Sequence, residues 1–294
     1  MKKASWEFEE GDEIVPGRYA LRRLGGGKRY EVYLAWDDKL FSQVVVKVVR
    51  PDQIGNDKSV QDLRREADTV GGLAHPMLVR SFGVSLQDDR PHLVLEHIEG
   101  PTLRRLIKGY GPLPLEQLVP LAVQVCGALH YMATESIVHL DVKPSNVVMS
   151  SPPKLIDLSV ARTHDAAKKL TQRVGTRSYM APEQCEPGPN RIGTWTDVWG
   201  AGVTFYEAVT GTRAFHADKE ADTEDKARAF PQLVEDPPAF PKETPGPIAE
   251  LILACLDKDP RSRPQAAEVA RGFEPLLAAI PERPRLRRGR PKLR

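Results

Sequence analysis

Short apolar runs rich in valine, leucine and aromatic residues recur along the first hundred positions of the chain, separated by glycines and polar residues. Such runs between turn residues are typical of β-strands. One stretch differs, because residues 57–73 carry apolar side chains at helical spacing and end at two glycines. The pattern predicts one helix and five strands, which we place at residues 19–24, 32–36, 41–49, 77–84 and 92–96.

The pattern changes after Glu99-Gly100-Pro101, which we interpret as a hinge. Residues 115–134 carry an apolar stripe at helical spacing, which we interpret as core and nothing more. Further helices are predicted near residues 103–108, 196–209, 248–256 and 264–279, with a long irregular region at 214–247. The chain after the hinge is therefore expected to be mainly helical.

Charge is spread unevenly over the 294 residues, whose formal net charge is +2. The last fifteen residues hold seven basic residues and one acid, so the remainder is mildly acidic at −4. Nucleic acid is therefore not expected as a partner. The basic tail is either a solvated end, which we favour, or a weak contact with anionic membranes.

The three cysteines are far apart and odd in number, which disfavours a disulfide framework or a metal site; they are Cys126, Cys185 and Cys255. No run approaches 18 apolar residues, and the N-terminus lacks the apolar segment of a secretion signal. We expect a cytoplasmic protein.

Four polar side chains with related chemistry lie in and just after one short stretch, His139-Leu140-Asp141-Val142-Lys143-Pro144-Ser145-Asn146. Asp141 can accept a hydroxyl proton, and Lys143 can hold a phosphoryl oxygen. Asn146 and Asp157, eleven residues later, can ligate Mg²⁺. This is the spacing of a protein-kinase catalytic loop followed by its metal-binding aspartate, although an ordinary surface loop is the alternative.

Two features of the strand-rich region fit the same chemistry. The glycine turn at residues 25–27 can fold its backbone amides over phosphates, with a plain hairpin as the alternative. Gly25 and Gly27 fit the first two glycines of G-x-G-x-x-G, and Tyr30 takes the third place. Lys47 is costly to bury unpaired, and Glu66 on the predicted helix could face it, unless Lys47 lies on an exposed strand face.

Three later motifs complete the set, namely Val-Gly-Thr-x-x-Tyr-Met-Ala-Pro-Glu at 174–183, Asp-Val-Trp-Gly-Ala-Gly at 197–202 and Leu-Asp-Lys-Asp-Pro-x-x-Arg-Pro at 256–264. With them the chain resembles the eukaryotic-like protein kinases over residues 19–279, most of all the bacterial Hanks-type serine/threonine branch. The resemblance implies an α+β, bilobal protein-kinase fold. The N-lobe, a five-stranded antiparallel sheet with one main helix, would comprise residues 18–99. The mostly helical C-lobe would comprise residues 100–279. Residues 1–17 and 280–294 would be an N-terminal tail and a basic C-terminal tail.

The resemblance also implies roles for single residues. Asp141, Lys143 and Lys47 would be catalytic, with Lys47 paired to Glu66. Asn146 and Asp157 would bind Mg²⁺, for which Mn²⁺ is an alternative. ATP would contact Leu24, Gly25, Gly27, Val32, Val45, Lys47, Glu66, Glu96, Ile98, Asn146 and Asp157.

Other implied roles are structural. Thr176 would contact the loop of Asp141, Glu183 would pair with Arg263, and Asp197 would brace the loop from below. The implied partners are protein substrates, and the oligomeric state stays open.

Four positions depart from the family pattern. Tyr30 would either crowd the phosphates or fold over them as a lid, and Val45 would narrow the roof of the adenine pocket. Leu140 replaces an arginine that pairs with a phosphate on the activation segment, so such phosphorylation is not expected to be the main on-switch. Ser159 replaces a glycine, which predicts fewer backbone excursions after Asp157.

The favoured function is therefore a serine/threonine protein kinase, which transfers the γ-phosphoryl group of ATP to proteins and also to itself. A pseudokinase that binds nucleotide or acts as a scaffold is the alternative, motivated by the four departures. A small-molecule kinase is a weaker third hypothesis, because such enzymes generally lack the Ala-Pro-Glu motif found here at 181–183.

Overall fold

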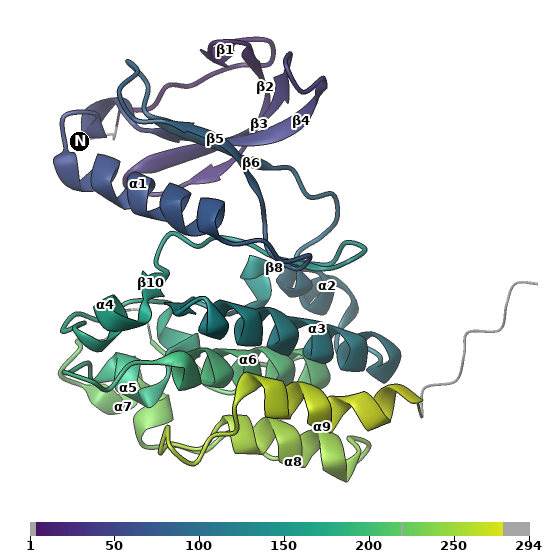
Figure 1. The fold of residues 1–294 in the computed structure, drawn as a ribbon. Coiled ribbons are helices and arrows are strands. Elements are labelled where there is room, and N and C mark those ends of the chain that lie inside the picture. Colours follow the sequence, from purple (N-terminus) through teal and green to yellow (C-terminus); the bar gives the residue numbers. More distant parts are fainter. Residues whose placement is uncertain (1–3, 219, 279–294) are drawn as a thin grey trace, which may run out of the picture.

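The computed structural model describes residues 4–218 and 220–278, which form a sheet-rich lobe above a helical lobe (Figure 1). Every strand pair of the upper sheet is antiparallel. Its order is β1-β2-β3-β4-β6-β5. The strands are β1 Glu13–Val15, β2 Arg18–Gly26, β3 Tyr30–Asp37, β4 Ser42–Val49, β5 Ser81–Ser85 and β6 His92–Glu96.

The expected count of five strands in this lobe was wrong, because the described part of the chain forms six. The additional strand β1 lies within residues 1–17, where we expected a tail or a loose cover. Ile14 and Val15 are buried in the core of the sheet, and Trp6 and Phe8 pack against that core. Three residues followed by Pro16-Gly17 are too short a run to show a strand period.

The alternation of side chains gives β3 and β4 two different faces. One face carries Tyr33 and the three valines 44, 46 and 48, which form a core with Ile14. The other face carries Tyr30, Val32, Lys47 and Val49, and Val32 lies opposite Lys47 in the register. The strand period therefore places Lys47 on the face opposite the core, while its neighbours Val46 and Val48 are buried in the core.

One long helix, α1 (Asp57–Gly72), packs under the sheet. The Asn56 side chain caps it by accepting a hydrogen bond from the backbone N–H of Lys58. Leu63 and Ala67 of α1 are buried against Val49 and Leu93 of the sheet. This contact sets the distance between the helix and β4.

The lower lobe is built around two long helices, α3 and α6, with α9 packed along α3 and α8 against α6. Their apolar stripes form the largest core cluster, as the sequence predicted for residues 115–134. The helices after the hinge are α2 Leu103–Tyr110, α3 Leu115–Thr134, α4 His164–Lys168, α5 Pro182–Cys185, α6 Thr194–Thr210, α7 Lys226–Ala229, α8 Gly246–Cys255 and α9 Ala266–Ala278.

Short elements connect these helices. In the described residues, four of them are two-residue strands, of which β7 pairs with β10 and β8 pairs with β9. Three others are 3-10 helices, and one further 3-10 helix, η1, precedes α1. They are β7 Ile137–Val138, β8 Val147–Val148, β9 Lys154–Leu155, β10 Arg162–Thr163, η1 Pro51–Gln53, η2 Pro144–Asn146, η3 Arg177–Tyr179 and η4 Pro231–Leu233.

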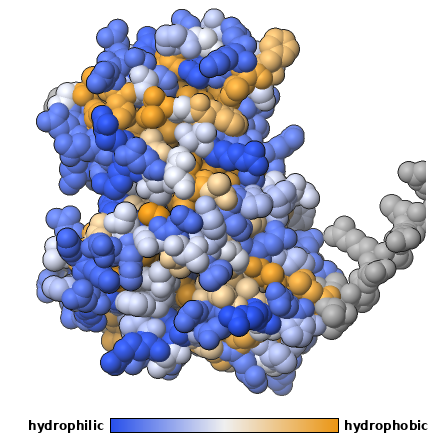
Figure 2. Space-filling model, in the orientation of Figure 1, coloured by the Kyte–Doolittle hydropathy of each residue, from blue (hydrophilic) through white to orange (hydrophobic). Residues whose placement is uncertain are grey.

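The face shown in Figure 2 is mostly hydrophilic, and it is indented between the two lobes. Across residues 4–218 and 220–278, no helix is both long and apolar enough to cross a membrane. The basic tail, residues 280–294, lies outside the described residues. Its proposed membrane contact therefore stays a prediction.

Candidate active site

The loop of residues 139–146 is fixed at both ends by short strands. β7 before it pairs with β10, and β8 after it pairs with β9. From below, the carboxylate of Asp197 on α6 accepts hydrogen bonds from the backbone N–H of His139 at 2.6 Å and of Leu140 at 2.7 Å. The predicted bracing by Asp197 is confirmed, and burial raises the pKa of this carboxyl to about 6.

Asp141 lies in a triangle of charged and polar groups. Its Oδ2 is 2.5 Å from Lys143 Nζ, and its Oδ1 accepts a hydrogen bond of 2.8 Å from the Thr176 hydroxyl. Lys143 Nζ also donates to that hydroxyl at 2.7 Å. The predicted contact of Thr176 with this loop is therefore confirmed. Asn146 Nδ2 donates to the Asp141 carbonyl at 3.0 Å, which holds the loop closed.

Lys47 and Glu66 form a buried ion pair, with Lys47 Nζ 2.6 Å from Glu66 Oε2. The pairing predicted from the sequence is confirmed. Lys47 Nζ is also 4.0 Å from the Asp157 carboxylate. Burial raises the pKa of Glu66, although the Lys47 ammonium opposes the effect. Burial acts on Asp157 in the same direction, but the Lys47 ammonium and a hydrogen bond from the Ser159 side chain outweigh it, so the pKa of Asp157 lies below its ordinary value.

Asn146 and Asp157 fit a magnesium ion that also binds phosphate oxygens. Asn146 uses its amide nitrogen on the Asp141 carbonyl, which leaves its amide oxygen as a ligand. The Asp157 side chain is 42% exposed and ionised. In the described part of the chain no three His, Cys, Asp or Glu side chains form a metal cluster. A site with few protein ligands suits Mg²⁺, which usually takes one or two carboxylates plus phosphates.

The other predicted nucleotide contacts lie on the sheet and the hinge. Leu24 and Gly25 are on β2, and Gly27 is in the turn that follows it. Val32 neighbours Lys47 in the register of β3 and β4, and Val45 on β4 lies opposite Leu95 of β6.

Glu96 and Ile98 mark the end of β6 and the hinge. The Glu96 carboxylate accepts a hydrogen bond of 3.0 Å from Lys154 Nζ. Its side chain therefore fixes the hinge to β9, and its backbone N–H donates to the Arg80 carbonyl at 2.9 Å.

The structure decides how three of the departures from the family pattern are accommodated. The Tyr30 hydroxyl donates to the Ser59 carbonyl of α1 at 2.7 Å, so the ring is not the lid over the phosphates that we considered. Leu140 is buried in an apolar cluster with Ala167 of α4 and Ile192. Asp157 and Leu140 have positive φ angles of 66° and 68°, whereas Ser159 is not among the described non-glycine residues with positive φ. The observed backbone therefore needs no positive φ at Ser159, and the smaller number of backbone excursions expected there stays a prediction.

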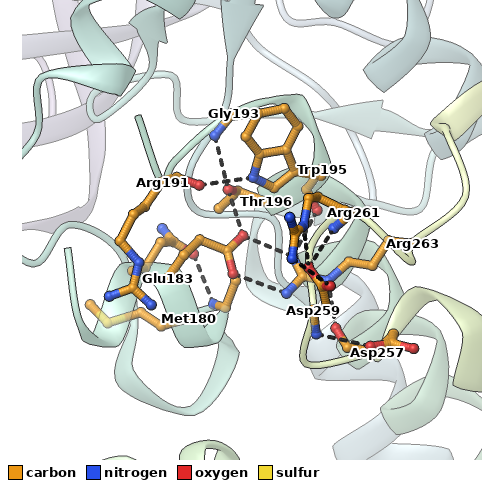
Figure 3. A network of polar contacts seen from close by, with 12 residues as sticks. Met180, Glu183, Arg191, Gly193, Trp195, Thr196, Asp257, Asp259, Arg261 and Arg263 are labelled. Atoms are coloured by element: carbon orange, nitrogen blue, oxygen red, sulfur yellow. Dashed lines mark hydrogen bonds and ion pairs between the residues drawn. The ribbon is translucent and has the colours of Figure 1, made fainter. Parts of the chain in front are cut away.

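A second buried ion pair joins Glu183 of α5, at the end of the activation segment (residues 158–183), to Arg263 (Figure 3). Arg263 donates from its two terminal nitrogens to the Glu183 carboxylate at 2.8 and 2.9 Å, as predicted. Thr196 adds a hydrogen bond of 2.8 Å to the same carboxylate. The pair fixes α5 to the loop before α9.

The structural roles of two residues at the site were missed from the sequence. Gln184 Nε2 donates to the carbonyls of Leu140 and Val174, which ties the activation segment to the catalytic loop. Gly175 has φ +113°, and a Cβ there would be 2.7 Å from the Leu140 carbonyl oxygen. The glycine before Thr176 was a signal for this close approach, whereas nothing in the sequence indicated the role of Gln184.

The comparisons with known proteins agree with this geometry. The family model described as protein kinase domain matches residues 19–272. A probable serine/threonine-protein kinase of Clostridium perfringens is 30% identical over 265 residues, covering 87% of this chain and 38% of that protein. The serine/threonine-protein kinase PknB of Mycobacterium leprae is 31% identical over 256 residues, covering 83% of this chain and 40% of that protein.

A third relative, PknB of Mycobacterium tuberculosis, is 31% identical over 264 residues, which cover 85% of this chain and 41% of that protein. The chain thus corresponds to well under half the length of these relatives. The family model nevertheless matches most of this chain, and the catalytic-loop contacts that the resemblance implied are present. The chain belongs to the protein kinase family, in the bacterial Hanks-type serine/threonine branch.

Proposed function

We propose that this chain transfers the γ-phosphoryl group of Mg-ATP to serine and threonine hydroxyls of proteins. The observation that supports it most is the Asp141 carboxylate, which accepts a hydrogen bond from the Thr176 hydroxyl while it contacts Lys143. A substrate hydroxyl would meet the same carboxylate in the same way, with its proton directed at an oxygen that can receive it.

The transfer needs little covalent chemistry from the protein. The substrate oxygen bonds to the γ-phosphorus, the bond from that phosphorus to the bridging oxygen breaks, ADP leaves, and Asp141 takes the hydroxyl proton. Lys143 would neutralise charge on the phosphoryl group. Lys47, held by Glu66, would hold the α- and β-phosphates. Most of the rate enhancement would come from position and charge.

Asn146 and Asp157 would hold the magnesium ion, or manganese in its place. When bound, the ion neutralises charge on the phosphate oxygens. The ionised Asp157 carboxylate, 4.0 Å from Lys47, supports this assignment, because Lys47 and the metal would then act on the same phosphates. These contacts favour catalysis over the pseudokinase alternative, since the groups that a pseudokinase usually loses are assembled here.

Protein acceptors are favoured over small molecules by the segment that follows Thr176. Arg263 and Glu183 hold α5 rigidly beside the catalytic loop, and Gln184 bonds to the loop itself. A rigid segment next to Asp141 is what an extended peptide would need as a support. Self-phosphorylation would use the same surface.

The experiment is phosphotransfer from labelled Mg-ATP to the chain itself and to a generic basic protein. Asp141→Asn and Lys47→Met should each abolish the label, which should reside on serine or threonine in the unmodified chain. Asp259→Asn makes the same chemical change at an exposed position and should leave the label unchanged. Equal label in Asp141→Asn and in the unmodified chain would contradict the proposal, as would label found only on metabolites.

A further inference from the structure

Tyr30 occupies an unusual position for an aromatic residue. It stands at the third place of the G-x-G-x-x-G pattern, where the family has a glycine without a side chain. It opens β3 and pairs with Val49 of β4 in the register. Its side chain therefore lies on the same face of the sheet as Lys47, the face that meets α1.

The Tyr30 ring contacts the charged pair of the active site. The Lys47 ammonium lies 5.0 Å from the centre of the ring, which is within the range of a cation–π contact. The same ammonium donates to Glu66 at 2.6 Å. The ring thus restricts the ammonium from one side while Glu66 holds it from another.

The Tyr30 hydroxyl contacts a different part of α1. It donates to the carbonyl oxygen of Ser59, in the first turn of the helix, at 2.7 Å. Glu66 is seven residues further along α1, which corresponds to about two turns and about 10 Å. Burial raises the pKa of Tyr30 to about 12, so the hydroxyl remains a donor at neutral pH.

Two attachments this far apart fix both the position and the rotation of a helix. Ser59 and Glu66 are the two points, and Tyr30 and Lys47 hold them to neighbouring strands. The ion pair of Arg29 with Asp62 adds a contact between them. Tyr30 and Glu66 also line a cavity of about 380 Å³ together with Val174 and Gly175.

Resting on the proposed function, we infer that Tyr30 is a positioning residue for phosphoryl transfer. It keeps α1 docked and the Lys47–Glu66 pair formed, without touching the nucleotide itself. In protein kinases this pair must be in place for turnover, and helix position and activation-segment phosphorylation commonly control it. Leu140 cannot bind such a phosphate. In this chain the Tyr30 side chain instead holds α1 against the sheet, through its contacts with Ser59 and Lys47.

The test compares Tyr30→Phe, Tyr30→Leu and the matched control Tyr33→Phe in the full chain. Tyr33 is on the same strand but on the opposite face, where its hydroxyl donates to Glu31 at 2.6 Å. Losing one hydroxyl contact should lower the kcat of Tyr30→Phe about 3- to 10-fold. Losing the ring as well should lower the kcat of Tyr30→Leu about 10- to 100-fold. In both variants the KM for ATP should stay within about twofold of the unmodified value.

Tyr33→Phe should lower thermal stability and leave kcat within about twofold. A rise in the KM for ATP with unchanged kcat in the Tyr30 variants would overturn the inference, because it would make Tyr30 a nucleotide contact. Equal losses of kcat in Tyr33→Phe and Tyr30→Phe would overturn it too, because they would indicate general destabilisation.

Hydrogen exchange of the α1 amides provides an arm that does not depend on catalysis. The amides of residues 59–67 should exchange faster in both Tyr30 variants, while those of α3 stay unchanged. If the unmodified chain transfers no phosphate, the proposed function fails, and hydrogen exchange still decides whether Tyr30 docks α1. Unchanged exchange in Tyr30→Leu would overturn it.

Discussion

Replacing Arg263 by methionine should destabilise the protein strongly, because the change leaves the Glu183 carboxylate charged and buried. The side chain of Arg263 is fully buried, and that of Glu183 is 2% exposed. Two nitrogens of the arginine contact the carboxylate, at 2.8 and 2.9 Å. Methionine fills most of the space of the arginine stem and removes only the charged group.

The expected cost follows from the burial of the pair. Removing one partner of a buried ion pair costs about 3–5 kcal/mol. The arginine also donates to the carbonyls of Asp257 and Trp195, and each lost bond adds about 1 kcal/mol. Because a whole domain is stable by only about 5–15 kcal/mol, this is a large fraction. At about 3 kcal/mol per molar urea, the denaturation midpoint should fall by about 2 M.

Urea denaturation followed by tryptophan fluorescence is the assay, and Arg261→Met is the matched control. Arg261 lies two residues away and pairs with Asp259 on the surface, where its side chain is 89% exposed. That variant should keep the midpoint of the unmodified chain. The double variant Glu183→Gln/Arg263→Met should be more stable than Arg263→Met, because it removes the orphaned charge. Equal midpoints for Arg263→Met and Arg261→Met would refute the reasoning.

Gly175→Ala should lower the initial rate of phosphotransfer at least about tenfold, because its Cβ would clash with the Leu140 carbonyl oxygen. Gly109→Ala is the control, and it should keep the rate because the space around Gly109 is open. Thr171 lies between Asp157 and Thr176, in the segment whose phosphate Leu140 cannot bind. Thr171→Ala should therefore leave transfer within a few fold, and a hundredfold loss would contradict this reasoning. Burial raises the pKa of Asp197 above its unfolded value, so its protonation favours folding and this contribution is lost as pH rises from about 4 to 6. The unfolding free energy of the unmodified chain should fall by about 3 kcal/mol over that window relative to that of Asp197→Asn. A difference in unfolding free energy between the two proteins that does not change with pH would contradict this prediction.

Much of the fold could be predicted from the sequence because its long elements have clear patterns. The β-branched run within residues 41–49 and the helical spacing along 115–134 both correspond to elements of the structure. The short elements could not be predicted in this way. The helix α4 has five residues, too few to show a period, and it depends on Ala167 packing against Leu140.

The same distinction applies to the site. Asp141, Lys143 and Asn146 are close in the chain, so their spacing alone indicated their chemistry. The contact of Tyr30 with Ser59 joins residues 29 positions apart, through a carbonyl oxygen that every residue possesses. Sequence spacing carries no signal for such a bond. The face of the strand and the position of α1 had to be known first.

The three cysteines give the protein a built-in probe of local opening. All of them lie in the helical lobe, and each is buried; they are Cys126 on α3, Cys185 on α5 and Cys255 on α8. Burial raises the pKa of Cys185 and of Cys255 to about 12, so almost no reactive thiolate exists while the lobe is closed. Alkylating reagents would therefore label the native chain only as fast as the helices separate. Because the sheet-rich lobe has no cysteine, the labelling rate would report local opening of the helical lobe alone.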